Sequence, residues 1–97
     1  MPEWTFLTNH AHTLLCISRD PGIRLRDVAD QVGVTERAAQ RIVSDLVEAG
    51  YLDRRREGRR NIYQIRADRP LRHPVEDGYR IDEILTVLNG NGNGTRP

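Results

Sequence analysis

The spacing of hydrophobic residues predicts a helix near the start of the chain, from Thr8 to about Arg19. Thr8 or Asn9 is suited to cap its N-terminus, and the sequence Asp20-Pro21-Gly22 ends it. Residues 23–25 follow as a very short extended stretch with apolar side chains on alternate positions. The expected buried face of the helix follows helical spacing and consists of Leu7, Ala11, Leu14, Leu15 and Ser18.

Two further helices are predicted on either side of Gly33. The first spans residues 26–32, and Gly33 ends it because glycine enters the left-handed backbone region at low cost. The second runs from Glu36 to Ala49, between Thr35 as the N-cap and Gly50 as the C-cap. The expected inward faces consist of Val28, Ala29 and Val32 in the first helix and of Ala39, Ile42, Val43, Leu46 and Ala49 in the second.

After the third helix the hydrophobic period changes from helical to alternating, which indicates a β-hairpin. We expect strands at residues 51–56 and 59–66, joined by a two-residue loop of Glu57 and Gly58. In this register Leu52 lies opposite Tyr63. The core side of the hairpin then consists of Leu52, Tyr63 and Ile65, and Ile62 faces outward.

The remainder of the chain predicts a connector and one short helix. Residues 67–79 contain two prolines and a glycine and are expected to be irregular. Residues 80–89 predict a C-terminal helix, because apolar residues reappear there at helical spacing. Residues 90–97, rich in Gly and Asn, are expected to form a disordered tail.

This order of elements is that of a winged helix-turn-helix. The expected fold class is α+β, mainly α, with a three-helix core, a two-stranded β-hairpin wing and one extra C-terminal helix. We assign residues 1–66 to the winged helix-turn-helix domain and 67–79 to the connector, and we interpret the helix at 80–89 as a dimerisation element.

Length and composition fit one small soluble domain. A chain of 97 residues allows a single modest core, and no apolar run approaches the roughly 18–20 residues of a membrane span. The N-terminus lacks the pattern of a secretory signal. The single cysteine, Cys16, excludes an internal disulfide. We therefore expect a cytoplasmic protein without a membrane partner.

Charge is distributed unevenly along the chain. The formal net charge is +1, and all 15 basic residues are arginine. Residues 35–66 carry eight arginines against five acidic residues, whereas the segments before and after them carry a slight acidic excess. A basic patch on a nearly neutral domain favours a nucleic-acid partner.

The helix-turn-helix and the segment after it form a specific pattern. The small Ala29 lets the two helices approach closely, Gly33 makes the turn, and Thr35 caps the second helix. The sequence VADQVGVTERAAQRIVSDLVEAGYLDRRREGRRNIYQI, within about residues 8–66, resembles bacterial winged-helix transcriptional regulators of the MarR type and, more loosely, of the ArsR type. The resemblance implies a transcriptional regulator that binds double-stranded DNA as a homodimer, with Glu36 to Ala49 as the recognition helix in the major groove.

Candidate DNA contacts come from the recognition helix and from the hairpin. Arginine reads guanine and glutamine reads adenine, and a helix N-terminus suits a phosphate. An ordinary solvated helix face, with a pair such as Arg41–Asp45, is the alternative interpretation. Within residues 54–60, five arginines against Glu57 alone favour contacts with the DNA backbone or the adjacent minor groove. The expected DNA-binding residues are Thr35, Arg37, Gln40, Arg41, Ser44, Arg54, Arg55, Arg56, Arg59 and Arg60.

Apolar residues near both ends of the chain predict an interface between copies. A helix as short as residues 80–89 is unstable alone, so it must pack either on its own domain or on a second copy. The expected dimerisation residues are Trp4, Phe6, Ile81, Ile84, Leu85 and Leu88.

No residue pattern predicts catalysis, a cofactor or a metal. Paired carboxylates, a nucleophile with its histidine, a phosphate-binding glycine loop and a dinucleotide motif are all missing from the sequence. His12 and Cys16 lie one helical turn apart, but two ligands are too few for a stable zinc site, so Cys16 is expected to be buried or interfacial. A small-molecule effector is left open. The competing function is a winged-helix protein-interaction module that uses the same face and includes Ile62.

Overall fold

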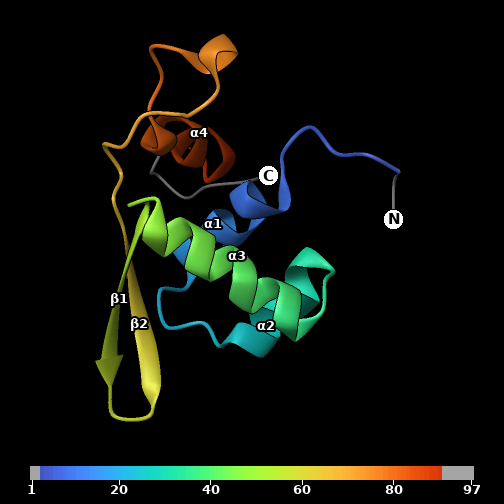
Figure 1. Cartoon of the computed structure of the whole chain (residues 1–97), viewed down its shortest axis with the longest axis vertical. Helices are drawn as coiled ribbons and strands as arrows, with labels where there is room; N and C mark the ends of the chain where they lie inside the picture. The colour runs from blue at the N-terminus through green and yellow to red at the C-terminus, as the bar shows by residue number, and fades with distance from the viewer. Residues whose placement is uncertain (1–2, 91–97) are drawn as a thin grey trace.

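The hydrophobic pattern produces a helical bundle from which a β-hairpin projects (Figure 1). The computed structural model describes residues 3–90 of the 97-residue chain. Its elements are α1 (Asn9–Arg19), α2 (Leu25–Val32), α3 (Glu36–Glu48), β1 (Leu52–Glu57), β2 (Arg60–Ile65), the 3₁₀ helix η1 (Pro74–Glu76) and α4 (Ile81–Leu88). The expected winged-helix class, mainly helical with a two-stranded wing, is confirmed. We call the hairpin β1–β2 with its loop the wing.

Threonine caps and a glycine fix the ends of the first helices. The Thr8 hydroxyl accepts a hydrogen bond from the backbone N–H of Ala11 at 3.2 Å, so Thr8 rather than Asn9 caps α1. The Thr35 hydroxyl accepts from Ala38 at 3.0 Å and caps α3. Gly33 closes α2 with a φ of 89°, in the left-handed region that glycine adopts most readily. The tight turn between α2 and α3 therefore follows from local chemistry.

Helix α1 is buried on a wider arc than its sequence pattern predicts. Leu14 and Leu15 are buried as expected, but Ile17 and Cys16 are buried as well. The reason is that α1 is covered twice, by α2 and α3 on one side and by α4 on another. The hydroxyl of the buried Thr13 donates to the carbonyl of Asn9 at 2.8 Å, so this polar group is satisfied.

The register of the wing differs from the expected one. Leu52 pairs with Ile65 rather than with Tyr63, and the loop consists of Gly58 and Arg59. Gly58 takes the left-handed backbone at the first loop position, with a φ of 62°, and the strands gain the pair of Glu57 with Arg60. The partner of Leu52 shifts by two residues, which preserves the alternation of faces. Leu52 and Tyr63 are accordingly still buried, and Ile65 is half-buried.

The expected extended stretch at residues 23–25 does not form a strand. Leu25 already belongs to α2, and the sheet contains only β1 and β2 among residues 3–90. The turn before α2 docks on the wing instead: the backbone N–H of Tyr63 donates to the carbonyl of Pro21 at 3.0 Å. Ile62, expected to face outward, is instead half-buried. Its side chain packs beside Gly22, because its Cδ1 atom lies 3.4 Å from the position that a Cβ atom on Gly22 would occupy. We call residues 20–24 the Gly22 turn.

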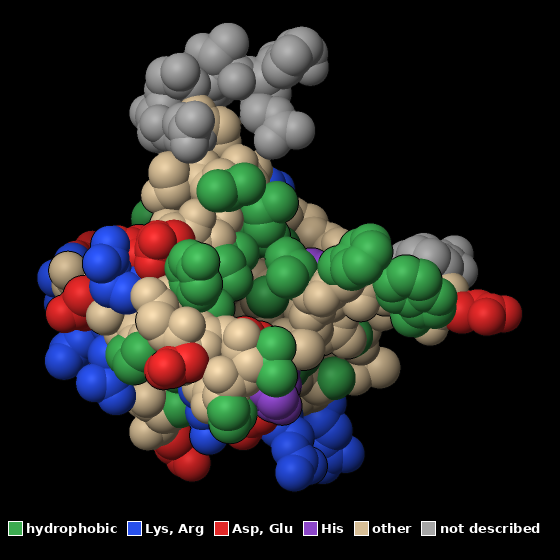
Figure 2. Space-filling model, turned by 90° about the horizontal axis from the view of Figure 1, so that it is seen from above, with side chains coloured by type: hydrophobic (Ala, Val, Ile, Leu, Met, Phe, Trp, Pro, Cys, Tyr) green, Lys and Arg blue, Asp and Glu red, His purple; other side chains and the backbone are tan. Residues whose placement is uncertain are grey.

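The connector and α4 close the end of the molecule opposite the wing (Figure 1). Helix α4 packs on α1, and Ile81 and Leu85 are buried there. The amide of Asn89 donates to the Ser18 hydroxyl at 3.0 Å, and the Arg19 guanidinium donates to the Asn89 side-chain oxygen at 2.8 Å. Seen from above, this end shows hydrophobic side chains gathered on its surface (Figure 2). The expected disordered tail, apart from Gly90, lies outside the described residues.

Within residues 3–90, none of the helices has the length and apolar character needed to cross a membrane.

Candidate nucleic-acid interface

A groove with a strongly basic lining lies between α3, the wing and the Gly22 turn. It encloses about 470 Å³, and its walls contain the guanidinium-bearing side chains of Arg24, Arg54, Arg59 and Arg60 beside Gln40. No Asp or Glu is among the described residues that line it. We call this feature the arginine groove. Its lining concentrates positive charge without a local counter-charge, an arrangement that attracts anions.

One face of α3 is exposed beside this groove. Arg37, Gln40 and Arg41 are exposed, and Ser44 is half-buried. The opposite face is buried in the core, as expected, and consists of Ala39, Ile42, Val43 and Leu46. The helix is thus rotated as its hydrophobic pattern predicts, and four of the five α3 candidates share one side of it.

The fifth candidate of this region, Thr35, stands at the start of α3 as its cap. Its side chain is exposed, and its hydroxyl is engaged by the backbone N–H of Ala38. Glu36 follows directly as the acidic residue of the first turn.

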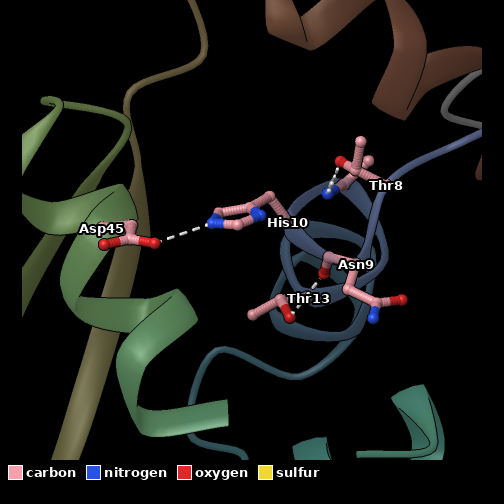
Figure 3. Close-up of polar contacts among 6 residues, drawn as sticks. Thr8, Asn9, His10, Thr13 and Asp45 are labelled. Atoms are coloured by element: carbon pink, nitrogen blue, oxygen red, sulfur yellow. Dashed lines mark hydrogen bonds and ion pairs between the residues drawn. The ribbon is translucent and has the colours of Figure 1, made fainter. Parts of the chain in front are cut away.

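The alternative pair of Arg41 with Asp45 does not form. Asp45 is bound instead by His10 of α1, whose Nε2 lies 2.9 Å from the Asp45 carboxylate (Figure 3). His10 points from α1 across to α3, and both side chains are about half exposed. Among residues 3–90 no hydrogen bond or ion pair engages the guanidinium of Arg41 or Arg37, so both are available to a ligand.

The five wing arginines have different partners, although all are exposed. Arg55 donates to Glu57 at 2.6 Å, and Arg56 donates to the carbonyl of Gly58 at 3.3 Å. The guanidinium groups of two others, Arg54 and Arg59, have no hydrogen-bond or ion-pair partner within the described part of the chain, and both residues line the arginine groove. The wing therefore presents two kinds of arginine: free groups facing the groove and groups already bound within the wing.

The remaining wing arginine has a structural contact. The Arg60 guanidinium donates to the carbonyl of Gly22, which joins β2 to the Gly22 turn. The sequence gives no signal for this bond, because its acceptor is a backbone carbonyl 38 residues away. Arg24 is the opposite case: it lines the arginine groove although the sequence did not single it out. The only signal available was its position two residues after Gly22 of the Pro-Gly turn.

The expected dimerisation residues fall into two groups. Ile81 and Leu85 are only 7% and 8% exposed, because they pack into the core of their own chain. Ile84 and Leu88 are half-buried, whereas Trp4 and Phe6 are 69% and 92% exposed. Folding of one chain therefore accounts for Ile81 and Leu85 and leaves the two aromatic side chains uncovered.

The cysteine and histidine of α1 do not assemble a metal site in the described residues. Cys16 is buried, and burial raises the pKa of its thiol. The ring of His12 lies 3.3 Å from the side-chain oxygen of Asn9. Residues 3–90 contain no cluster of three or more His, Cys, Asp or Glu arranged to hold a metal ion.

Comparison with known proteins places these features in a family. Residues 5–60 match the sequence profile of the MarR family. Among solved structures, the PcaV transcriptional regulator from Streptomyces coelicolor, determined in complex with its natural ligand, matches with a TM-score of 0.54 and 24% sequence identity. The match covers 90% of this chain and 62% of PcaV, so the chain spans about three fifths of that relative.

A second solved structure, the zinc-dependent MarR family regulator AdcR in its Zn(II)-bound state, matches with a TM-score of 0.48 and 22% identity, over 67% of this chain and 46% of that one. A search of curated proteins gave no match. The likeness to PcaV shows the fold, and the profile extends over more than half of the chain. The chain therefore belongs to the MarR family, whose members are DNA-binding transcriptional regulators rather than enzymes.

Proposed function

We propose that this chain is a sequence-specific, double-stranded-DNA-binding regulator that acts as a homodimer. Helix α3 is the recognition helix in the major groove, and the wing lies on the DNA backbone or in the adjacent minor groove. The observation that carries the proposal is the arginine groove, whose lining brings four guanidinium groups together without a carboxylate. Membership of the MarR family supports the same conclusion.

The arginine groove suits a phosphate backbone. Arg24, Arg54 and Arg59 come from separate segments of the chain, and within residues 3–90 no carboxylate neutralises them. Like charges that line one groove repel in the free protein, and an anion between them relieves that repulsion. A DNA strand supplies a row of such anions, and guanidinium groups bind phosphate oxygens in bidentate fashion. The groove thus fixes where the duplex lies without reading its sequence.

The exposed face of α3 supplies groups that read base edges. Arg41 and Arg37 offer paired donors that match the O6 and N7 acceptors of guanine, and Gln40 matches the N6 and N7 groups of adenine. Gln40 also lines the arginine groove, so the base-reading face and the phosphate-binding surface are continuous. Thr35 stands at the N-terminus of the same helix, where a phosphate is favoured.

A single copy reads only a few base pairs. Helix-turn-helix proteins therefore bind as dimers, with half-sites one helical turn, roughly 34 Å, apart. This geometry supports a homodimer and predicts a two-fold symmetric operator.

The competing function, a protein-interaction module on the same face, is disfavoured by the position of the exposed apolar side chains. The large hydrophobic residues that remain exposed all lie outside α3 and the wing: Trp4, Phe6, Val75, Tyr79 and Val87. Ile62, the apolar candidate of the wing, is partly covered by the Gly22 turn. The α3 face is thus polar, as a DNA-reading surface requires.

The experiment is a fluorescence-anisotropy titration of a random-sequence duplex, at low salt and again at higher salt. We expect binding that weakens steeply with salt, because each neutralised phosphate contributes about 0.9 to the slope of log K against log salt. The double variant Arg54→Ala/Arg59→Ala should bind less tightly and with a slope shallower by about 2.

Arg80→Ala is the matched control, since Arg80 is exposed and pairs with Asp82 at the opposite end of the molecule. It removes one arginine charge, whereas the double variant removes two, and it should leave the slope unchanged. A wild-type protein that does not bind at low salt, or an Arg80 variant that loses as much as the double variant, would refute the proposed function.

A further inference from the structure

The arginine groove is a concave site as well as a charged surface. Its volume of about 470 Å³ lies within the range of roughly 300–1,000 Å³ that is typical of small-molecule sites. Three segments that are separate in the sequence form its walls: the Gly22 turn, α3 and the wing. The turn that leads into α2 runs beside β2 (Figure 1), and the hydrogen bond from the N–H of Tyr63 to the carbonyl of Pro21 joins them. The groove is therefore formed before any ligand binds.

Most of the polar side chains that line the groove have no partner of their own. The guanidinium groups of Arg24, Arg54 and Arg59 have neither a hydrogen-bond nor an ion-pair partner within residues 3–90. The same holds for the side-chain amides of Gln40 and Asn61, which also belong to the lining. All five side chains present donors, and a phosphate oxygen is a charged acceptor. An anion in the groove can therefore receive hydrogen bonds from three segments of the chain at once.

The positive charge of the groove exceeds what one phosphate of a DNA strand neutralises. Arg60 carries the fourth guanidinium of the lining, and its bond to the carbonyl of Gly22 leaves its positive charge in place. Each nucleotide of a DNA strand contributes a single negative charge, whereas the linked phosphates of a free triphosphate carry several charges within one compact group. The groove thus matches a short phosphate chain in charge.

The apolar part of the lining strengthens these interactions and limits what else is recognised. It includes Ile23, Val43 and Tyr63, which are all buried. Low-dielectric walls beside charges of one sign focus the electric field on an ion in the cleft. Tyr63 is the only aromatic residue among the described lining residues, and it is 6% exposed, so no ring is available to stack on a nucleobase. The groove therefore suits the phosphate chain and not a base attached to it.

We propose that the arginine groove is a binding site for a free phosphate chain, either inorganic triphosphate or the triphosphate of a nucleotide, and that this anion competes with DNA for Arg24, Arg54 and Arg59. Anion binding stands on the groove alone, whereas the competition rests on the proposed function. Arg37 and Arg41 of the base-reading face do not line the groove. The anion therefore displaces the DNA backbone without covering that face, and it lowers the affinity for every duplex by the same factor.

The experiment is isothermal titration calorimetry of the full chain with inorganic triphosphate, at constant ionic strength and without divalent metal ions. We expect saturable binding of one triphosphate per chain. Arg24→Ala and Arg54→Ala should each weaken this binding about tenfold, because each substitution removes charge-assisted hydrogen bonds. Orthophosphate should also bind about tenfold more weakly than triphosphate, since a single phosphate reaches fewer of the guanidinium groups.

Arg41→Ala and Arg80→Ala are the matched controls. Each removes one exposed arginine outside the groove, Arg41 from α3 and Arg80 from the opposite end of the molecule. Both variants should bind triphosphate as the wild type does. Without ligand, circular dichroism should show the same melting for the wild type and the two groove variants, because Arg24 and Arg54 are exposed. Triphosphate should then raise the melting temperature of the wild type more than that of either groove variant.

A titration with ATP distinguishes the two sources of the phosphate chain. ATP should bind as tightly as inorganic triphosphate, because the lining offers no exposed ring to the base. ATP that fails to bind while triphosphate binds would assign the groove to the inorganic chain. ATP that binds far more tightly than triphosphate would show that the base is recognised and would overturn the assignment.

Three other results would overturn the anion site. They are no binding of triphosphate, equal affinities for orthophosphate and triphosphate, and equal losses in Arg24→Ala and Arg41→Ala.

Competition on DNA separates this inference from the proposed function. Triphosphate should raise the apparent Kd for a random duplex more than sodium sulfate of the same ionic strength does, and by the same factor for the preferred operator. If the wild type binds triphosphate but no duplex, the anion site stands and the DNA proposal fails. If it binds the duplex but not triphosphate, the anion site fails alone. Binding of both without competition would overturn the shared groove.

Discussion

The wing end of the molecule and the opposite end, which carries residues 3–7 before α1 and is called here the arm end, expose opposite kinds of side chain. At the wing end, Arg24, Arg54 and Arg59 carry charges that no described carboxylate neutralises. At the arm end, Trp4 and Phe6 are large rings that remain 69% and 92% exposed. Each arrangement is unfavourable in water for a different physical reason, electrostatic repulsion in one case and exposed hydrocarbon in the other.

The difference teaches that the two ends suit different partners. Uncompensated guanidinium groups are satisfied by a polyanion, whereas exposed rings are satisfied by an apolar surface. The core of α1, α2 and α3 lies between the two ends, so one partner does not obstruct the other. The proposed function, in which DNA and a second copy are bound together, is compatible with this separation.

The largest effect is expected from a residue that supports both ends. Ile42 is 8% exposed in the core, on the face of α3 opposite the arginines. Ile42→Ala leaves a cavity and should lower the free energy of unfolding by about 2–5 kcal/mol. Urea denaturation followed by circular dichroism measures this loss. Unchanged stability would mean that α3 is rotated differently from the structure described above.

A substitution on the proposed base-reading face of α3 should change DNA affinity without changing stability. Arg41 is exposed and its guanidinium is free among the described residues, so Arg41→Ala should leave unfolding unchanged. Its affinity for the preferred operator should fall by about 1–3 kcal/mol, with relaxed preference at one base pair. Operator selection followed by titration of single-base variants tests this. A uniform loss on every sequence would instead make Arg41 a phosphate contact.

Within the wing, the partners of each arginine predict a smaller difference. Arg59→Ala removes a free charge that lines the arginine groove and should reduce the salt slope by about one unit. Arg55→Ala removes a charge that already pairs with Glu57 and should reduce the slope by less. Parallel titrations over a salt series distinguish the two. Equal losses would show that the Arg55–Glu57 pair opens when DNA binds.

The smallest effect is expected from an exposed pair between α1 and α3. The pair of His10 and Asp45 joins α1 to α3, and both side chains are about half exposed. Exposed pairs of this kind contribute about 0.2–1 kcal/mol, so Asp45→Asn should lower stability by no more than that. Thermal melting measures the shift. Because the substitution removes a negative charge beside the exposed face of α3, the affinity for DNA should rise slightly rather than fall.

Features set by neighbouring residues could be predicted from the sequence. Thr8, Thr35 and Gly33 define helix ends through local hydrogen bonds and backbone preferences, so the helices were found within a residue or two. The hairpin was found, but not its register, because a shift of two residues in pairing leaves the same side chains on the core face.

Features that depend on contacts between residues far apart in the sequence could not be predicted. An apolar stripe on α4 shows that the helix must be covered, but not whether its own chain or a second copy covers Ile81 and Leu85. Arg24 and Arg60 depend on how the Gly22 turn docks against β2, and that contact leaves no trace in residue spacing. The sequence therefore predicts which arginines are exposed, whereas the fold determines which of their guanidinium groups lack a hydrogen-bond or ion-pair partner among the described residues.

The bonds from Pro21 and Gly22 to the wing have a consequence for the thermodynamics of binding. A hairpin that is free to swing loses conformational entropy when a ligand fixes it, and this loss reduces affinity. Here the N–H of Tyr63 and the guanidinium of Arg60 hold β2 against the turn that precedes α2, so the wing is already ordered in the unbound protein. A preordered wing keeps a fixed distance from α3. In the proposed complex, the protein would then discriminate among duplexes by the width of their grooves as well as by their bases, because DNA rather than protein must deform to fit.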